Sequence, residues 1–412
     1  MNTLTQAQQE MSLTSKKHKA SPAFVEFVII VSMMISLTAL SIDAMLPALP
    51  QIGHDLGITN PNDRQLIIAI IFFGSALGQL FFGPLSDKTG RKPAMYAGYA
   101  FFITGSLVSV FSANFPMMLA GRIFQGIGLS APQAVTMALV RDQFEGRRMA
   151  RVMSFVMTVF VLIPMIAPAI GQGILSIAGW RTIFGSFLLF ALITVTWFAL
   201  RIPETLAPEN RSPFSVRRIA NSIREILKIR STLGYALSVG FIQGIFLGYL
   251  NSSQQIFQEQ YALGKMFPLF FAAISLSIGM ASLLNARLVI LYGMIKLVQW
   301  ALGIAFSLAV IFLGTAVVFA GQPPLWLLMV FLMMSFLCTG ILFGNLNALA
   351  MQPLGRLAGI GAAVVGSFST LISMLLGTLI GRSYNGTILP LVLGMTMLSG
   401  ITIFVIRWAT SE

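Results

Sequence analysis

The chain has almost none of the side chains on which metal sites and disulfides depend. Its 412 residues include one cysteine, Cys338, and two histidines, His18 and His54. One thiol can build neither a disulfide framework nor a cysteine metal site, and Cys338 in its apolar run is interpreted as a small core residue. The histidines lie far apart in polar segments, so we expect no metal site and no cofactor. No nucleophile–base pair stands out, which argues against an enzyme.

Charged residues are also scarce, at 9% of the chain, whereas 56% of the residues are hydrophobic. A soluble domain has about 25% charged and about 45–50% apolar residues, so this composition excludes a soluble protein. A helix crosses a hydrocarbon core about 30 Å thick with about 20 apolar residues, and such runs recur along nearly the whole chain. The net charge of +13 does not indicate nucleic-acid binding, because the basic residues lie between the apolar runs, where they set membrane topology.

The apolar runs predict an all-α integral membrane protein whose twelve transmembrane helices form two pseudo-symmetric bundles of six. The first bundle is expected to contain helices at 24–47, 64–85, 94–113, 116–140, 150–176 and 180–201. The second is expected to contain helices at 232–257, 266–290, 295–320, 324–350, 357–381 and 384–408. The predicted domains are a basic tail (1–23), the first bundle (24–201), a central loop (202–231), the second bundle (232–408) and a short tail (409–412).

A faint internal repeat supports two parallel halves. Gly146–Phe155 and Gly359–Phe368 share five identities in ten positions at an offset of 213 residues. They begin the fifth and eleventh predicted helices, which are equivalent positions in two six-helix halves. Chance similarity between apolar segments could give the same match, so the repeat is support only.

The distribution of basic residues orients the predicted helices. With the N-terminus inside, 21 of the 26 Lys and Arg residues would lie in cytoplasmic segments and four in outer loops, with Arg122 alone inside a helix. This bias places both termini in the cytoplasm. The first apolar run is too long for a signal peptide and lacks a cleavage site, so we expect it to be retained. The central loop contains a basic amphipathic stretch, Arg217–Arg230, expected to lie on the membrane surface.

The loop between the second and third predicted helices, Gly83–Pro93, reads GPLSDKTGRKP. It is not a phosphate-binding loop, because the glycine required before the lysine is absent and no strand precedes it, so no ATP site is expected. The segment resembles the loop signature of the major facilitator superfamily. That resemblance implies the superfamily's two-bundle fold, and without an ATP site transport would have to run on an ion gradient.

Within this loop, the resemblance implies a conformational latch between the two halves. Asp87 would meet the N-terminal end of the eleventh helix and a neighbouring arginine, for which Arg141 is our candidate. Gly83 and Gly90 would permit close helix contact and a tight turn. Arg91 is assigned to the same latch. A solvated turn is the plainer alternative.

Asp43 lies near the outer end of the first predicted helix, where it begins the pattern Asp-x-x-Leu-Pro-x-Leu-Pro. Desolvation disfavours the charged form of a buried carboxylate, so a group in this place can carry a proton through a conformational change. The pattern resembles helix 1 of bacterial drug:proton antiporters, especially the bicyclomycin- and chloramphenicol-resistance branch. The alternative is a helix-end carboxylate among lipid headgroups. Glu26, at the other end of this helix, is expected to face headgroups or water.

Arg122 falls inside the fourth predicted helix, with Gln125 on the following turn. Inserting an arginine near the bilayer centre costs about 2.5–3.5 kcal/mol, so its side chain must face protein or a water-filled cavity. The family resemblance assigns this arginine to proton coupling. A structural arginine that hydrogen-bonds to carbonyl groups is the alternative.

The fifth predicted helix contains Pro164, Pro168, Gly171 and Gly173. Prolines inside a helix remove backbone hydrogen bonds and kink it, and glycines let helices pack closely. The segment resembles the antiporter signature of helix 5, although the usual opening glycine is replaced. A generic kinked helix is the alternative.

The second half has no carboxylate inside a predicted helix, so we expect proton coupling in the first half and a substrate cavity shaped by the second. The cavity candidates are Gln125 from the first half and Gln243, Asn251, Gln254, Gln255, Asn345 and Asn347 from the second. Hydrogen bonds between helices explain any one of them equally well. The 33 Phe and 23 Met residues suit a cavity for varied apolar compounds, although most must face lipid or packed helices.

The leading hypothesis is a proton-coupled exporter of small hydrophobic or amphipathic compounds, drugs included, working by alternating access in a bacterial inner membrane and functional as a monomer. Its partners would be the substrate, protons and the lipid bilayer, with no nucleic acid and no ATP. A dedicated exporter of one metabolite, such as a siderophore or an amino-acid derivative, is the nearest alternative. A proton symporter fits the helix 5 pattern less well. A membrane sensor or scaffold is a remote alternative.

Overall fold

The computed structural model describes residues 24–212 and 215–411, so the predicted basic tail at 1–23 lies outside the described residues. Twelve segments of the described chain are helical, long and apolar enough to cross a membrane, as predicted. Those of the first half are α2 (Phe24–Asp43, continued by α3, Leu49–Asp55), α4 (Leu66–Thr89), α5 (Arg91–Val110), α6 (Phe115–Gln143), α7 (Gly146–Ile177) and α8 (Trp180–Arg201). Those of the second half are α10 (Arg230–Gln254), α11 (Phe267–Tyr292), α12 (Met294–Val318), α13 (Leu325–Met351), α14 (Ala358–Arg382) and α15 (Leu389–Thr410).

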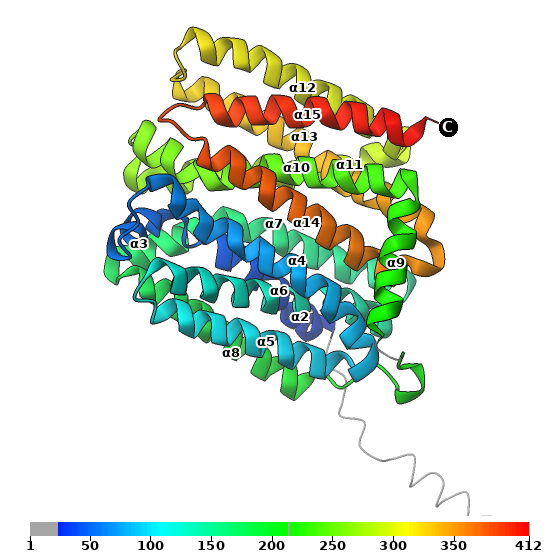
Figure 1. Cartoon of the computed structure of the whole chain (residues 1–412). Coiled ribbons are helices and arrows are strands. Elements are labelled where there is room, and N and C mark those ends of the chain that lie inside the picture. Colours follow the sequence, from blue (N-terminus) through cyan, green and yellow to red (C-terminus); the bar gives the residue numbers. More distant parts are fainter. Residues whose placement is uncertain (1–23, 213–214, 412) are drawn as a thin grey trace, which may run out of the picture.

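The helices pack as two bundles of six. Helices α2 and α4–α8 contact one another mainly among themselves, as do α10–α15. The bundles meet where α4 lies beside α14 and α7 lies beside α11. In each pair the second helix of one half meets the fifth helix of the other, as expected if a pseudo-two-fold axis relates the halves. Figure 1 shows α12 and α15 at one side of the molecule, α5 and α8 at the other, and α4 and α14 between them.

Two helix boundaries differ from the sequence prediction because of prolines. The first helix was predicted to run unbroken over 24–47, but α2 ends at Asp43 and is followed by a 3₁₀ turn, η1 (Leu46–Ala48), and by α3. Pro47 and Pro50 each stand in the first turn of these short elements, where the missing N–H of proline is tolerated. The last helix begins at Leu389 instead of 384, again with a proline in its first turn.

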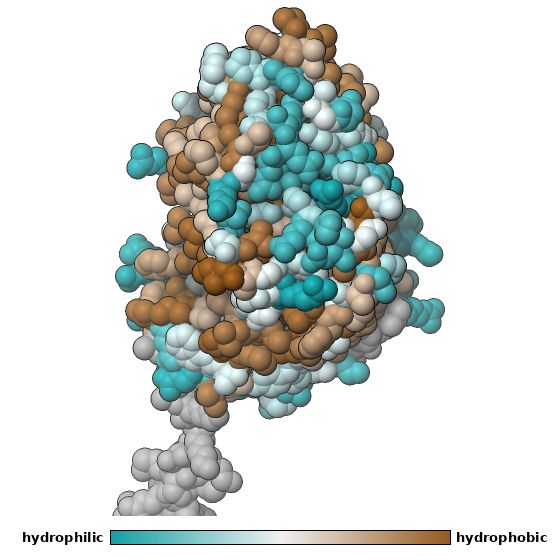
Figure 2. Space-filling model, turned by 90° about the vertical axis from the view of Figure 1, so that its left-hand side faces the viewer, coloured by the Kyte–Doolittle hydropathy of each residue, from teal (hydrophilic) through white to brown (hydrophobic). Residues whose placement is uncertain are grey.

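The predicted amphipathic stretch of the central loop contains a helix, α9 (Val216–Lys228). In Figure 1 α9 runs across the ends of the other helices, on the side of the molecule where the C-terminus lies. We call this end, where α2 begins and α15 finishes, the terminal face. The other end, which carries α3, is called the opposite face. Figure 2 looks onto the opposite face and shows hydrophilic residues gathered over its middle, flanked by hydrophobic ones.

Close packing of α4 against α6 fixes the centre of the first bundle. A Cβ atom on Gly126 would lie 2.0 Å from the carbonyl oxygen of Ile71, and one on Gly74 would lie 2.2 Å from that of Ile123. Only glycine fits such contacts, which let two helix backbones approach closely. As a consequence, side chains of α6 can reach carbonyl groups on α4.

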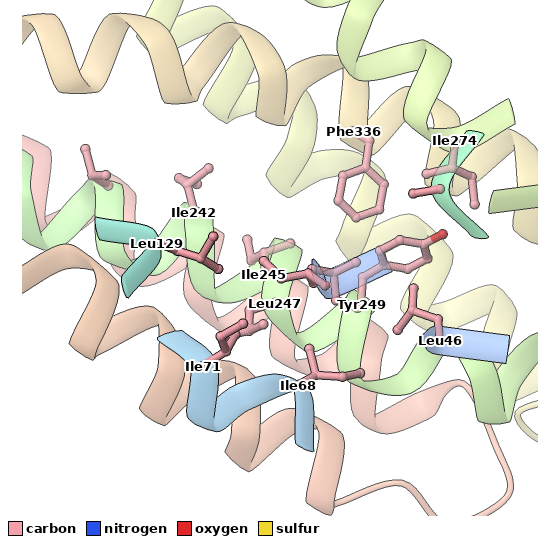
Figure 3. Packing of buried hydrophobic residues seen from close by; sticks show 14 of the residues in the cluster. Leu46, Ile68, Ile71, Leu129, Ile242, Ile245, Leu247, Tyr249, Ile274 and Phe336 are labelled. Atoms are coloured by element: carbon pink, nitrogen blue, oxygen red, sulfur yellow. The ribbon is translucent and has the colours of Figure 1, made fainter. Parts of the chain in front are cut away.

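The core between the bundles is apolar. Figure 3 shows Leu46 and Ile68 of the first half lying near Leu247 and Tyr249 of the second. All four side chains are at most 1% exposed. Tyr249 also packs against Phe271 and Phe336, with ring centroids 5.8 and 4.8 Å away. The two halves are thus joined near the break in the first helix.

Candidate functional site

A cavity of about 200 Å³ lies between the two bundles. Six helices line it: α2, α4 and α6 from the first half, and α10, α13 and α14 from the second. The lining residues are Thr38, Ile42, Ile71, Phe72, Ser75, Gln79, Leu129, Gln133, Val239, Gln243, Phe343, Asn347, Gly366, Ser369 and Thr370. None of them carries a formal charge, and eight of the fifteen have amide or hydroxyl side chains.

Two of the predicted cavity residues, Gln243 and Asn347, line this cavity. The other five amides do not, because each is held elsewhere by a hydrogen bond. Gln125 binds Arg122 and Ser106, Asn251 binds the carbonyl of Gly377, Gln254 binds Gln258 and Glu259, Gln255 binds Gln65 and Asn62, and Asn345 binds Asn285. These contacts join turns and neighbouring helices, which is the common use of buried amides in membrane proteins.

The sequence prediction missed the polar residues that α4, α6 and α14 contribute to the cavity. Ser75 and Gln79 are one turn apart on α4, and Gln79 donates a hydrogen bond to Ser75 (3.2 Å). Ser369 and Thr370 come from α14, and Gln133 from α6. The i, i+4 spacing of Ser75 and Gln79 was a readable signal of a polar helix face, but it does not show which neighbour that face meets.

Asp43 is the last residue of α2, immediately before the break in the first helix. Its side chain is 4% exposed, and Oδ1 has no hydrogen-bond partner among the described residues. The Asp43 carboxyl does not line the cavity, although its neighbour Ile42 does. The Tyr249 hydroxyl of the other half is also buried without a hydrogen-bond partner in the described chain.

Arg122 is completely buried inside α6 and ties three helices together. Its Nε donates to the Ile67 carbonyl on α4 (2.9 Å) and its Nη1 to the Ser41 carbonyl on α2 (3.1 Å). Nη1 also donates to Gln125 Oε1 (2.7 Å), and the Gln125 amide in turn donates to Ser106 on α5 (2.9 Å). No ion pair shorter than 4.0 Å links Arg122 to Asp43 in the described chain. The guanidinium therefore holds the backbone two residues before Asp43 rather than its carboxylate.

The predicted latch residues of the Gly83–Pro93 loop gather at the terminal face, with one correction. The Asp87 carboxylate accepts a hydrogen bond from Arg91 (2.7 Å), and Arg91 also donates to Asp142 (2.9 Å). Within the described residues no ion pair joins Asp87 to Arg141, whose side chain is exposed. Arg141 precedes Asp142 on α6, and its side chain is exposed. The partner of Asp87 is therefore Arg91, four residues further along the chain at the start of the next helix, and not Arg141 as predicted.

The latch region also approaches the second half of the chain. A Cβ atom on Gly83 would lie 4.0 Å from Cβ of Ala363 on α14, and Ser367 of α14 donates a hydrogen bond to the Ala76 carbonyl of α4 (2.7 Å). Asp87 itself remains 49% exposed on its side chain. No hydrogen bond or ion pair of the described residues connects its carboxylate to α14, so the predicted contact with that helix end is not formed in this conformation.

Glu204, which the sequence prediction did not single out, caps the N-terminus of α5. One of its carboxylate oxygens accepts from the backbone N–H of Arg91 (2.8 Å) and the other from that of Lys92 (3.0 Å). An acidic group at the start of a helix satisfies free N–H groups and complements the helix dipole. Gly90, with φ of +106°, lets the chain turn beneath this carboxylate, and a Cβ atom there would lie 2.5 Å from Glu204 Oε2.

The two glycines predicted for the helix 5 motif have different surroundings. Pro164 and Pro168 both lie inside α7. A Cβ atom on Gly171 would lie 1.6 Å from the carbonyl oxygen of Ala44, whereas one on Gly173 would meet nothing within 4 Å. Gly171 is thus the point where α7 touches the residue directly after Asp43.

A polar seam joins the two halves at the opposite face. Asn62 donates to the carbonyls of Arg382 (3.0 Å) and Tyr384 (2.8 Å). Ion pairs connect Asp63 with Arg382 (2.9 Å) and Arg64 with Glu259 (3.2 Å). Beneath them lies the amide pair of Gln65 and Gln255. We call these residues the opposite-face seam.

Tyr384 contributes a further contact to the opposite-face seam. Burial raises the pKa of Tyr384 to about 12, so its hydroxyl stays protonated at neutral pH and can donate to the Gln255 carbonyl (3.4 Å). The seam therefore combines ion pairs, amide contacts and a tyrosine hydroxyl, and it closes the gap between the halves at this end of the cavity.

The side chains of the site can form hydrogen bonds to a small molecule and include one buried carboxyl group. Within residues 24–212 and 215–411, no group of three or more His, Cys, Asp or Glu side chains could hold a metal ion. What the described chain offers is an uncharged cavity, a buried carboxyl group beside it and polar contacts that join the halves at the opposite face.

Comparison with known proteins gives a consistent assignment. The profile of the Major Facilitator Superfamily matches residues 31–378. The chain is 32% identical to the uncharacterized MFS-type transporter YdgK of Bacillus subtilis (strain 168), over 85% of this chain and 87% of that protein. It is 27% identical to a bicyclomycin resistance protein homolog of Haemophilus influenzae, over 94% of this chain and 96% of that protein. It is also 27% identical to the multidrug resistance protein MdtL of Klebsiella pneumoniae, over 89% and 91%.

Solved structures give the same fold. The human organic anion transporter MFSD10 superposes with a TM-score of 0.70 at 18% identity, over 95% of this chain and 100% of that one. The xylose transporter XylE of E. coli superposes with a TM-score of 0.71 at 14% identity, over 93% and 96%. With twelve membrane-spanning helices in two bundles of six and a superfamily profile that matches most of its length, the chain belongs to the major facilitator superfamily of transporters.

Proposed function

We propose that this chain exports small molecules from a bacterial cell in exchange for protons, by alternating access between its two bundles. The observation that carries the proposal is Asp43, a buried carboxyl group with an unpartnered oxygen, placed at the break of the first helix and beside the cavity. A carboxylate without an ion partner is costly to bury, whereas its protonated form is not. A proton can therefore cross with the conformational change.

The proposed cycle uses the contacts around Asp43. Proton binding at Asp43 from the outside would accompany release of the substrate, and proton loss to the inside would accompany binding of the next one. Arg122 positions the end of α2 through the Ser41 carbonyl (3.1 Å), and Gly171 of α7 packs against Ala44. A change of charge on Asp43 would thus be felt by α6, which packs against α4, and by α7; α4 and α7 are the first-half helices that lie beside the second half.

The bias of Lys and Arg residues supports a cytoplasmic terminal face with both termini inside. In that orientation the opposite-face seam closes the outer side, so the described conformation would receive substrate from the cytoplasm. The short outer loops and the bacterial relatives support the inner membrane as its location. One chain supplies both halves and every residue of the cavity, which supports function as a monomer.

Two candidate cargo ranges remain, and each has its own support. The names of the relatives from Haemophilus and Klebsiella favour efflux of several drugs. The cavity favours a dedicated exporter of one metabolite, because amide and hydroxyl walls select a compound with matching groups more strongly than apolar walls do. No methionine lines the cavity, and Phe72 and Phe343 are its only aromatic residues, so the flexible apolar cavity suggested by composition is not what the described residues form.

Proton movement in energised everted membrane vesicles tests the proposal. A dye that reports the pH gradient would be followed while single compounds from a chemically varied panel are added. Wild type, Asp43→Asn and Asp55→Asn would be compared at equal expression, since Asp55 lies on the same segment but at the opposite face, bonded to Trp180 (2.8 Å). We expect dissipation of the gradient with wild type and Asp55→Asn, and none with Asp43→Asn.

The panel also separates the two cargo ranges. Responses to several unrelated compounds support multidrug efflux, and a response to one compound supports a dedicated exporter. Full proton exchange in Asp43→Asn would refute the role of this carboxyl group.

A further inference from the structure

We infer that the cargo is an uncharged compound that offers several hydrogen-bond donors and acceptors and has a compact core of about eight non-hydrogen atoms. This inference concerns the cargo-binding cavity and rests on the proposed transport function. It replaces the broad class of hydrophobic or amphipathic compounds with a chemical class that the cavity walls define.

The charge of the cavity wall is the first argument. Not one of its fifteen lining residues is acidic or basic. The nearby ionisable groups are turned away from it: Asp43 is 4% exposed and Arg122 is fully buried, and neither contributes to the lining. A cation or anion entering this space would lose hydration without gaining a partner of opposite charge, which costs far more than burying a neutral polar group.

The hydrogen-bonding capacity of the wall is the second argument. Gln133 of α6 and Gln243 of α10 face the cavity from opposite halves. Both side chains are half-buried, and neither amide takes part in a hydrogen bond within the described chain. Each primary amide offers two donors and an acceptor. The two glutamines therefore present matched, unused groups to a ligand placed between the halves.

The cavity wall also contains hydroxyl groups and phenylalanine rings, which favour an uncharged compound as well. Thr38, Ser75, Ser369 and Thr370 add hydroxyl groups, and Phe72 and Phe343 add apolar surface. Two phenylalanine rings could attract a cation, but this attraction is weaker than the cost of desolvating an unpaired charge. A compound with an apolar ring and a neutral polar group fits these walls better than an ion of the same shape.

The size of the cargo follows from the volume. A dry cavity of about 150 Å³ holds benzene, with six non-hydrogen atoms. The cavity between the halves measures about 200 Å³. In the described conformation it accommodates a compact group of about eight such atoms, and larger compounds would extend beyond it.

Three probes of one shape and different charge test this inference. Benzamide is neutral, benzamidine is a cation and benzoate is an anion, and all three have the same planar skeleton. Binding to the purified full-length chain in detergent would be measured by calorimetry and by the shift in thermal unfolding. We expect benzamide to bind at least about tenfold more tightly than either ion, since an unpaired buried charge costs well above 1.4 kcal/mol.

A single isosteric substitution should reverse the preference. Gln243→Glu places a carboxylate in the cavity wall without changing its shape, so benzamidine should become the tightest of the three probes. Gln322→Glu, an exposed site at the opposite face, is the matched control and should keep the wild-type order. Binding of benzamidine to wild type as tightly as benzamide, or binding of none of the three probes, would overturn the inference.

Because binding is measured without a proton gradient, this result is separate from the test of export. Preference for benzamide in a chain that shows no proton exchange would uphold the cargo class and refute proton-driven export. Proton exchange that only permanent cations elicit would uphold proton-driven export and refute the uncharged cargo class.

Discussion

The contact between α7 and the break in the first helix gives the sharpest mutational prediction. A Cβ atom on Gly171 would lie 1.6 Å from the Ala44 carbonyl oxygen, and an ordinary contact needs at least 3.4 Å. In Gly171→Ala the two backbones must therefore separate by about 1.8 Å. Helix α7 also contacts the second half, since a Cβ atom on Gly279 of α11 would lie 2.6 Å from Val161, so a retreat of α7 from Ala44 would disturb that contact as well.

The magnitude of the effect follows from this geometry. Overpacking of a well-packed core costs about 1–3 kcal/mol, and we expect the upper end of that range because the atoms nearest to Gly171 are backbone atoms of Ala44, which cannot rotate away. Displacement of the residue beside Asp43 by more than 1 Å is enough to lower a rate by about 100-fold. We therefore expect Gly171→Ala to reduce proton-linked exchange by at least about tenfold.

Gly173→Ala is the matched control, since its added methyl group meets nothing within 4 Å. Initial rates of gradient dissipation in everted vesicles would be compared at equal expression. Size-exclusion chromatography in detergent would show that both variants fold. A folded Gly171→Ala variant with wild-type exchange would refute the argument that this contact transmits the state of Asp43, and a loss in Gly173→Ala would show that the motif acts in another way.

Two further predictions concern the contacts between and within the halves. Arg382→Gln removes the ion pair with Asp63 (2.9 Å), which is worth up to about 1 kcal/mol. An impermeant maleimide added from the opposite face should therefore label a Thr38→Cys variant up to about fivefold faster. Unchanged labelling would show that the ion pair does not hold the opposite-face seam closed. Glu204→Gln weakens the cap of α5 and should lower the unfolding temperature by a few degrees. Glu209→Gln, at an exposed position of the central loop, should leave the unfolding temperature unchanged. Equal unfolding temperatures of the two variants would refute the capping role of Glu204.

Hydrophobicity alone was enough to predict the twelve helices, whereas their arrangement as two bundles rested on the central polar connection, the faint repeat and the superfamily resemblance. Twelve apolar runs, each long enough to cross a membrane, give twelve helices, because the bilayer requires every backbone polar group to be bonded within its own helix. The predicted helix boundaries were wrong where prolines, which lack an N–H group, interrupt the hydrogen bonding of the helix. At Pro47 and Pro50 the helix stops and restarts within a single membrane span, and an apolar stretch does not reveal that break.

The candidate site could be predicted only in part, because residue type does not show which way a side chain faces. Gln125 and Gln243 are both glutamines inside apolar helices, yet the first bonds to Arg122 and the second lines the cavity. Gly171 and Gly173 belong to one motif, but only the first touches another helix. These differences depend on how each helix is rotated against neighbours that are distant in sequence, which a single sequence does not encode locally.

The absence of charge in the cavity wall has an energetic consequence for the whole cycle. If a neutral compound leaves as a proton enters, each turnover moves one net positive charge into the cell. The exchange is then electrogenic, and the membrane potential contributes about 2.3 kcal/mol per 100 mV in addition to about 1.4 kcal/mol per unit of pH difference. Export would therefore continue in surroundings whose pH equals that of the cytoplasm, where the pH difference vanishes and the potential alone remains.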